Sequence, residues 1–229
     1  MRHLFVSPHL DDAVLSCGEL IASSAAALVV TVFAGRPSQD APRTPWDAAC
    51  GFGPDDDPIA TRRNEDHAAL DVLGAQPLWL DFRDDQYGER RPAATIAAAL
   101  ADTVAREALG EVYVPLGLFH ADHLRASEAA LAVFPQFANL AWRAYADAIY
   151  RRIGGAVDDR MRALADAGIA LTPMTPHCAA DAHARKREAV ACYASQLRGL
   201  RSRHHHDDVF AREAYWRVQR AGGEGPLAS

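Results

Sequence analysis

Short apolar runs alternate with stretches of helical periodicity through much of the chain. Apolar runs bounded by turn-forming residues predict strands at residues 4–7, 27–33, 78–82 and 112–115. Apolar positions at helical spacing predict helices from about Asp12 and at residues 62–73, 92–108 and 124–134. Strands that alternate with helices are typical of a parallel sheet. We therefore predict an α/β, Rossmann-like fold with a mostly parallel sheet and helices on both faces.

At 229 residues the chain is long enough to bury one large core. We expect a single domain over residues 1–220 and a flexible, glycine-rich tail over residues 221–229. Residues 35–60 are rich in Pro, Gly and Asp, and we expect a long loop there that faces the substrate as a lid. Residues 201–208 contain three consecutive histidines, and we interpret this segment as an internal loop rather than a metal site.

Composition and charge exclude several classes of protein. The net charge is −6 and basic residues form no stripe, which argues against nucleic-acid binding. The longest apolar stretch, residues 20–34, is too short to span a bilayer, and no secretory signal precedes it. The four cysteines show no C-x-x-C spacing, which indicates reduced thiols in a cytoplasmic protein, with a disulfide as the alternative. A homo-oligomer stays open, because the sequence does not specify an assembly.

One histidine and two aspartates stand at the end of the first predicted strand. His9, Asp11 and Asp12 follow the apolar run 4–7, at the place where open α/β sheets bind their ligands. Histidine and aspartate are also ligands of catalytic divalent metals, which keep one position open for water. The alternative interpretation is structural, because aspartates before an apolar helix commonly cap its N-terminus.

A second cluster of the same residue types follows the fourth predicted strand. The β-rich run 111–116 is broken by Gly117, and His120, Asp122 and His123 precede the next helix. If the two strands lie near each other, the clusters together offer three metal ligands, plus a carboxylate and an imidazole for proton transfer. Taken alone, the two histidines read equally well as surface residues on a loop. The pairing of the clusters therefore predicts a catalytic metal site.

With these motifs the sequence resembles the LmbE/PIG-L-like family of zinc-dependent N-acetylglucosaminyl deacetylases. The family's opening motif, (A/S)-P-H-(P/L)-D-D-(E/A), stands as SPHLDDA at residues 7–13, and its H-x-D-H motif stands as HADH at residues 120–123. The resemblance covers roughly residues 2–217. Weaker matches follow in the family's order at residues 61–66, 80–84 and 186–196.

Two positions depart from the family pattern. Ala13 replaces a common glutamate, and Gly18-Glu19 replaces a common glycine pair. Neither position is a metal ligand in the family, so the departures leave the metal site intact. They bear on the substrate, because residues of the pocket wall decide what fits.

The resemblance implies a role for each residue of the two motifs. His9, Asp12 and His123 would bind Zn²⁺, with Fe²⁺ as the alternative, since two histidines and a carboxylate also suit non-haem iron. Asp11 would be the general base for a zinc-bound water and then the acid that protonates the leaving amine. An amide needs this assistance, because it is a poor electrophile with a poor leaving group.

The remaining site residues are also implied by the resemblance. His120 would stabilise the tetrahedral oxyanion, and Asp122 would orient or tune a neighbouring imidazole. Arg62 and Asp84 match family positions that contact substrate hydroxyls. The alternatives are that Arg63 takes this role, or that Arg62 forms an ordinary helix-face ion pair with Glu65.

The sequence therefore predicts a metal-dependent amidohydrolase that removes an N-acetyl group from an N-acetylglucosamine-type sugar or its conjugate, a small-molecule substrate. One alternative keeps the metal but cleaves another amide or an ester, as a carbohydrate esterase does. The other alternative is a non-catalytic sugar-binding relative, against which the presence of both Asp11 and His120 argues.

Overall fold

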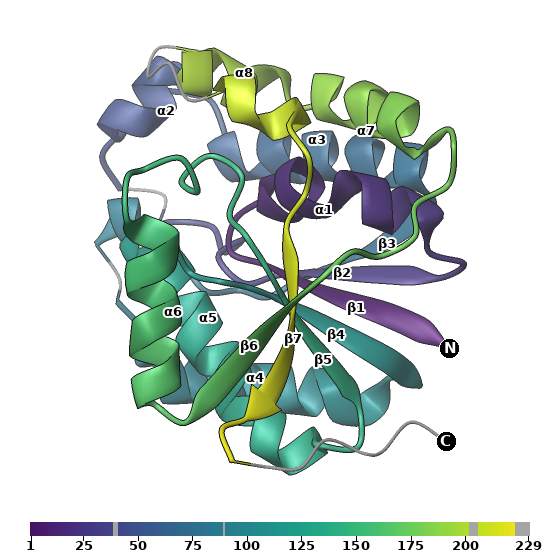
Figure 1. The fold of residues 1–229 in the computed structure, drawn as a ribbon. Helices are drawn as coiled ribbons and strands as arrows, with labels where there is room; N and C mark the ends of the chain where they lie inside the picture. The colour runs from purple at the N-terminus through teal and green to yellow at the C-terminus, as the bar shows by residue number, and fades with distance from the viewer. Residues whose placement is uncertain (39–40, 89, 202–205, 223–229) are drawn as a thin grey trace.

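The computed structural model describes most of the chain, namely residues 1–38, 41–88, 90–201 and 206–222. Seven strands in these residues form one sheet with the order β3-β2-β1-β4-β5-β7-β6 (Figure 1). Strands β1 to β5 are parallel, and β7 runs antiparallel to both β5 and β6. The predicted mostly parallel sheet is confirmed. The strands are β1 (Arg2–Ser7), β2 (Ala27–Thr31), β3 (Ala75–Trp79), β4 (Leu109–Pro115), β5 (Ala141–Tyr145), β6 (Ile169–Met174) and β7 (Tyr215–Arg220).

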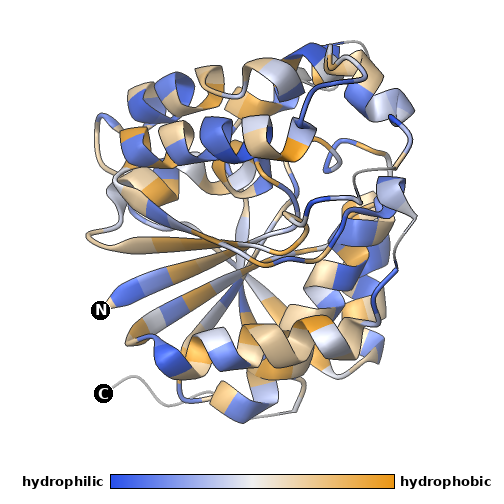
Figure 2. Ribbon diagram, turned by 180° about the vertical axis from the view of Figure 1, so that it is seen from behind, coloured by the Kyte–Doolittle hydropathy of each residue, from blue (hydrophilic) through white to orange (hydrophobic). Residues whose placement is uncertain are grey.

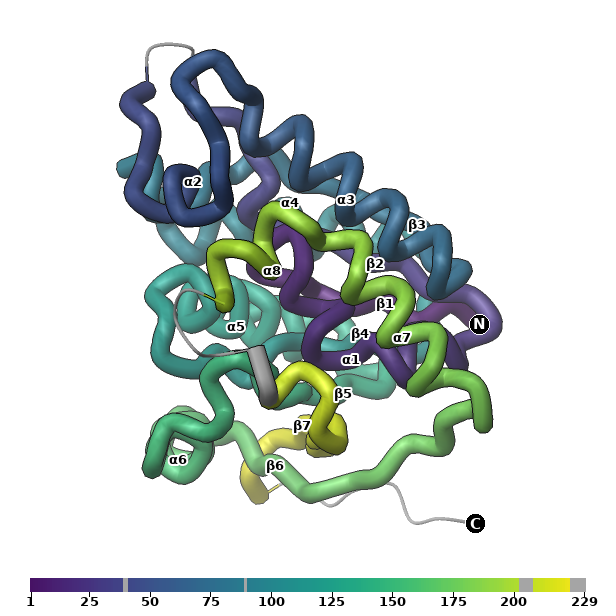
Figure 3. The backbone as a smooth tube through the Cα atoms, turned by 90° about the horizontal axis from the view of Figure 1, so that it is seen from above, coloured from purple at the N-terminus to yellow at the C-terminus, as the bar shows by residue number. Residues whose placement is uncertain are grey.

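Helices cover both faces of the sheet (Figures 1 and 3). Helices α1, α3, α7 and α8 lie on one face, and α4, α5 and α6 lie on the other. None of the described helices is long and apolar enough to cross a membrane. The helices are α1 (Asp12–Ser23), α2 (Pro45–Ala49), α3 (Pro58–Leu73), α4 (Ala93–Arg106), α5 (Ala121–Val133), α6 (Ala156–Asp166), α7 (Ala182–Ala191) and α8 (Ala194–Arg201), with short 3-10 helices η1 (Asp85–Tyr87), η2 (Phe134–Phe137) and η3 (His206–Phe210).

The sheet separates two apolar cores. Leu4 and Val6 of β1 pack into the core beneath α4 and α5, whereas Phe5 packs into the core beneath α1 and α3. Figure 2 shows hydrophobic residues along the strands between the two helical layers. A strand buried on both faces needs apolar side chains at every position. This explains why the strands appear in the sequence as continuous apolar runs.

Some predicted boundaries are wrong. Strand β3 begins at Ala75, three residues before the predicted 78–82, and α3 begins at Pro58 rather than at residue 62. The expected loop 35–60 also contains helix α2, whose N-cap Thr44 accepts a hydrogen bond from the backbone of Asp47. Both helices start with a capping residue followed by proline, a signal that is present in the sequence.

The structure tests only one of three further expectations, which concern the cysteines, the two segments 201–208 and 221–229, and the domain boundary. The four cysteines are free thiols, so the alternative of a disulfide is wrong. The histidine run and the expected tail at 221–229 lie largely outside the described residues. The single domain over residues 1–220 stays a prediction.

The order of the strands brings the two sequence motifs together. From β1 the chain moves outward through β2 to β3, then returns to place β4 on the other side of β1. The helices that follow β1 and β4 therefore leave toward opposite faces, and a crevice opens between them at the carboxyl ends of the strands. Both His/Asp motifs lie at this crevice.

A buried ion pair holds the C-terminal segment against the helices. Lys186 on α7 is fully buried, and its Nζ lies 2.8 Å from Oε1 of Glu213. Glu213 also accepts hydrogen bonds from the hydroxyl of Tyr215 and from the backbone N–H of Glu19 on α1. The pair therefore joins three parts of the fold that are distant in sequence.

We expect Lys186→Met to lower the free energy of unfolding by about 3–5 kcal/mol, because it leaves the Glu213 carboxylate buried without its cation. Urea unfolding followed by circular dichroism measures this change. The double variant Lys186→Met/Glu213→Gln removes both charges, so its free energy of unfolding should fall by less than that of the single variant. Equal midpoints for the single variant and the wild type would contradict the expectation.

Candidate metal centre and active site

The turn after β1 is closed by side chains of the first motif. Ser7 Oγ donates to the backbone oxygen of His9 and accepts from the N–H of Ala13, 2.9 Å away. Asp12 Oδ2 accepts from the N–H of His9 at 2.9 Å. Asp11 is the N-cap residue of α1, but its side chain makes no capping hydrogen bond. The interpretation of Asp11 as a side-chain cap is therefore wrong, and its carboxylate is available for another role.

The turn after β4 is equally constrained. Gly117 has φ +81°, and a Cβ there would lie 2.6 Å from the Cβ of Ser127, so only glycine fits. Helix α5 begins at Ala121 with His120 as its N-cap, where Nδ1 accepts from the N–H of Asp122 at 3.2 Å. Because Nδ1 is an acceptor, the neutral imidazole of His120 carries its proton on Nε2.

Three side chains from the two turns converge on one point. Asp12 Oδ2 lies 3.0 Å from His9 Nδ1 and 3.1 Å from His123 Nε2. Tetrahedral zinc holds nitrogen and oxygen ligands at ~2.0–2.1 Å, which puts neighbouring ligand atoms about 3.3 Å apart. His123 Nε2 is buried, and its contact with Asp12 is not a well-formed hydrogen bond. This buried nitrogen and the spacing both fit a divalent metal.

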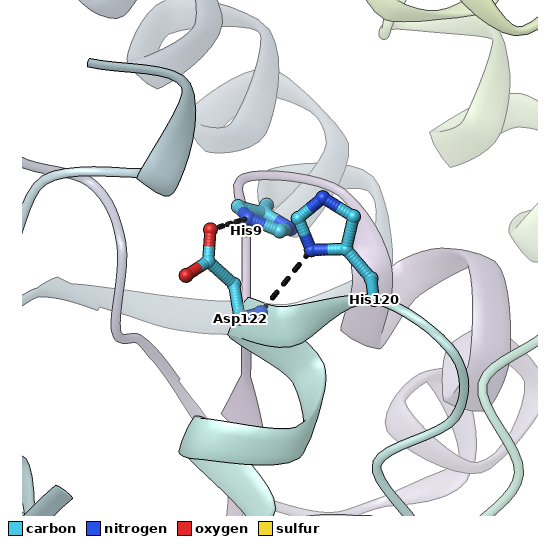
Figure 4. Close-up of side chains that lie close together, drawn as sticks. All are labelled: His9, His120 and Asp122. Atoms are coloured by element: carbon cyan, nitrogen blue, oxygen red, sulfur yellow. Dashed lines mark hydrogen bonds and ion pairs between the residues drawn. The ribbon is translucent and has the colours of Figure 1, made fainter. Parts of the chain in front are cut away.

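A second group, His9, His120 and Asp122, also lies close together (Figure 4). Its carboxylate already has other partners. Asp122 Oδ2 accepts from the N–H of Asp85 at 3.0 Å and lies 3.2 Å from His9 Nε2, and Oδ1 lies 2.8 Å from the Arg125 guanidinium. Asp122 therefore pairs with Nε2 of His9, the ring nitrogen that faces away from Asp12, and is poorly placed as a metal ligand. The set of His9, Asp12 and His123 fits a metal better.

The electrostatics of the cluster favour a bound cation. Burial lowers the pKa of His123, but the carboxylates of Asp12 and Asp147 outweigh it and raise this pKa to about 9. Burial likewise opposes the charged form of His9, and Asp84 and Asp12 nevertheless raise its pKa. Burial also works against ionised Asp12, yet the two histidines hold its pKa well below the usual range. A metal that binds here therefore displaces protons from the imidazoles.

Asp11 and His120 respond differently to the same surroundings. Burial, reinforced by the neighbouring Asp12, raises the pKa of Asp11 to about 8. A carboxyl of this kind accepts and returns a proton near neutral pH. Burial, together with the nearby His9 and His123, lowers the pKa of His120, which keeps its ring neutral.

A cavity of about 260 Å³ opens beside the cluster. Asp84 and Arg62 line it, as do Trp46 and Ile59 from the region predicted to form a lid. Arg63 is absent from the lining. The predicted site residues thus lie around one cavity, except that Asp122 stands behind His9 rather than in the wall.

The helix-face pair of Arg62 with Glu65 is wrong. The guanidinium of Arg62 is buried and pairs with Asp47 of α2 at 2.8 Å, while Glu65 accepts hydrogen bonds from Ser195. Tyr87 donates to the same Asp47 carboxylate. These contacts fix the orientation of Arg62 at the cavity wall.

The sequence interpretation missed Asp147, which follows β5. This buried carboxylate lies 2.6 Å from His123 Nδ1 and accepts the N–H groups of Gly117 and Leu118. It therefore directs Nε2 of His123 toward Asp12. Carboxylates in this position raise the basicity of a metal-binding histidine. No predicted strand pointed to this loop, so Asp147 carried no signal in the sequence.

We expect Asp147→Asn to weaken metal binding about 10- to 100-fold, the usual cost of losing such a carboxylate. An amide cannot accept from the imidazole and from two backbone N–H groups at once. Titration of the apoprotein with zinc against a chromophoric chelator measures the affinity. Asp158→Asn, on the exposed surface of α6, is the matched control. Unchanged affinity in Asp147→Asn would refute the orienting role.

Several solved structures similar to this chain are deacetylases. The chain is 29% identical to a triple mutant of a deacetylase of the teicoplanin biosynthetic pathway, over 98% of this chain and 100% of that one, with a TM-score of 0.82. It is 28% identical to the A40926 pseudoaglycone deacetylase Dbv21, over 97% and 99%, with a TM-score of 0.77. The zinc inhibited form of teicoplanin deacetylase Orf2 is 25% identical over 98% and 100%, with a TM-score of 0.75.

A comparison with curated proteins finds no match. The sequence model of the family described as PIG-L, GlcNAc-PI de-N-acetylase, matches residues 4–134. This match includes both His/Asp motifs and covers more than half of the chain. The chain therefore belongs to the PIG-L family.

Proposed function

We propose that the protein is a metal-dependent N-deacetylase that hydrolyses the acetamide of an N-acetylglucosamine-type sugar within a larger conjugate. The observation that carries this proposal is the convergence of His9, Asp12 and His123 beside the buried carboxyl of Asp11. Similar solved structures include deacetylases of teicoplanin biosynthesis and of the A40926 pseudoaglycone, which supports a glycoconjugate substrate.

The residues divide the chemistry among them. His9, Asp12 and His123 would hold a divalent metal, which would supply Lewis acidity for the attacking water and for the amide carbonyl. Asp11 takes the proton of the attacking water and returns it to the departing amine. His120, with its proton on Nε2, donates a hydrogen bond to the oxyanion. Asp122 holds the ring of His9, as Asp147 holds that of His123.

Polar side chains at the cavity wall suit a sugar. Arg62 and Asp84 would bind hydroxyl groups, and Gln86 lines the cavity beside them. Gln86 Nε2 donates to Asp84 at 2.7 Å, which fixes the carboxylate that faces the sugar. Arg62 is similarly fixed by Asp47, so both residues are oriented before substrate arrives.

We propose Zn²⁺ as the physiological metal, with Fe²⁺ as the alternative, because the ligands are two imidazoles and one carboxylate. One of the similar structures is a zinc inhibited form, so metal identity has to be measured on protein purified without added metal. The free thiols support a cytoplasmic location.

Amine release from N-acetylated sugars, compared with acetate release from O-acetylated sugars, tests the proposal. We expect free amine from N-acetylglucosamine conjugates and negligible hydrolysis of the esters. Preferential ester hydrolysis would instead establish a carbohydrate esterase. Sugar binding without hydrolysis of either substrate, with zinc or iron(II) supplied, would establish a non-catalytic sugar-binding protein.

A further inference from the structure

Phe119 is a large apolar side chain left exposed at the rim of the catalytic cavity. Its exposed fraction is 69%, and the other exposed large apolar residues in the described part of the chain are Met1 at 99% and Phe210 at 38%. Of these three, only Phe119 lines the cavity. A single exposed apolar residue is ordinary on a protein surface, so the significance of Phe119 depends on its place at the cavity and on the ring beside it.

The backbone at Phe119 is strained. Phe119 has φ +60°, and it is the one described residue other than glycine with a positive φ. The N–H of His120 donates to the oxygen of Leu118 at 2.6 Å, which closes a three-residue turn around Phe119. Such turns are rare and strained, and strain of this kind persists mainly at functional sites. Phe119 thus stands directly before the catalytic candidate His120, with its phenyl ring exposed.

A second aromatic ring extends the surface. The ring centroid of Phe119 lies 5.5 Å from that of Tyr150, and the Tyr150 ring is nearly parallel to the imidazole of His120, with an angle of 14° and a separation of 6.2 Å. We call Phe119 and Tyr150 the aromatic shelf. Ile149 continues its apolar character along the cavity wall.

The shelf and the polar wall belong to opposite sides of the crevice. Arg62 and Asp84 come from α3 and from the segment after β3, whereas Phe119 and Tyr150 follow β4 and β5. In the sheet, β3 lies on one side of β1 and β5 lies on the other. A sugar whose hydroxyls contact Arg62 and Asp84 therefore turns its other end toward the shelf.

The size of the cavity places further groups of the substrate at this rim. Its volume of about 260 Å³ is at or below the ~300 Å³ from which pockets for drug-sized ligands start. An amino sugar fills such a space, so any group attached to it must lie over the edge. The edge on the side away from the polar wall is the aromatic shelf.

We propose that the shelf binds an aromatic aglycone, so that the substrate is an aryl glycoside of an N-acetylated amino sugar and Phe119 determines this specificity. The proposal rests on the proposed N-deacetylase function. Two adjacent rings bind a planar aromatic group more favourably than a small aliphatic one, through offset or edge contacts with ring centroids about 4.5–7 Å apart. The shelf acts on substrate selection, while the metal ligands and Asp11 act on the bond that is cleaved.

The test compares phenyl and methyl N-acetyl-β-glucosaminides as substrates and as ligands. Wild-type protein should prefer the phenyl glycoside in kcat/KM and in binding affinity measured by calorimetry. Phe119→Ala should reduce this preference about three- to tenfold, the size of one aromatic contact. Phe119→Trp should retain the preference, which separates loss of the ring from disturbance of the turn. Phe210→Ala, another exposed phenylalanine, is the matched control and should retain it too.

Each outcome decides the proposal. Equal phenyl-to-methyl ratios in the wild type and in Phe119→Ala would overturn it. A ratio that is lost in Phe119→Ala but not restored in Phe119→Trp would also overturn it, because the turn rather than the ring would matter. An effect of Phe119→Ala confined to N-octanoylglucosamine would place an acyl chain on the shelf and equally overturn the aglycone. If no glycoside is hydrolysed, the proposed function fails, while the binding ratio still decides the role of the shelf.

Discussion

Replacement of His123 by alanine will remove the bound metal and the release of amine together. His123 is buried, and its Nε2 faces the carboxylate of Asp12 at 3.1 Å. Two remaining ligands hold zinc weakly, and catalysis loses the several kcal/mol that a Lewis acid supplies. We expect kcat/KM to fall on the order of a thousandfold or more. Metal content by mass spectrometry and amine release are measured on the same sample.

Two control variants separate metal binding from catalysis. His120→Ala should retain the metal while it loses turnover, because His120 lies beside the ligand set rather than in it. His183→Ala, on the surface beside Glu19, should retain both. Stoichiometric metal in His123→Ala would exclude His123 as a ligand. Absence of metal from reconstituted wild-type protein would contradict the convergence of the two motifs.

The sequence alone was sufficient to predict the elements that have strong local patterns. Strands buried on both faces appear as apolar runs, and His9, Asp12, His120 and His123 stand immediately after two such runs. A parallel sheet then places both groups at one edge. What the sequence does not specify is that β1 and β4 are neighbours, because strand order depends on packing between distant segments.

Residues that act through distant contacts were not predictable in the same way. Asp147 reaches His123 only because β5 lies beside β4, and Asp47 reaches Arg62 only because the fold brings α2 near the first turns of α3. Phe119 gave no signal either, because a positive φ at a residue other than glycine is not expected from its type. Each of these residues depends on tertiary structure rather than on a local pattern.

Replacement of Asp11 by asparagine should greatly reduce turnover but leave the metal bound. Asp11 is buried beside the ligand set, but its carboxylate is not one of the three converging groups. Asparagine preserves the shape of the side chain and cannot take a proton from water or return one to the amine. Loss of a general base typically costs 10²- to 10⁴-fold, so we expect kcat to fall by about that factor. Asp56→Asn, on the exposed surface, is the matched control.

The two variants of the metal centre are thus expected to differ in metal content. His123→Ala should lose metal and activity, whereas Asp11→Asn should lose activity alone. The fold of Asp11→Asn should be retained, because the amide has nearly the same shape and, like the protonated carboxyl that burial and Asp12 favour, carries no charge. Full turnover by Asp11→Asn with metal bound would show that another group moves the proton. Loss of metal from Asp11→Asn would instead make Asp11 part of the binding site, and the division of labour between the two adjacent aspartates would be wrong.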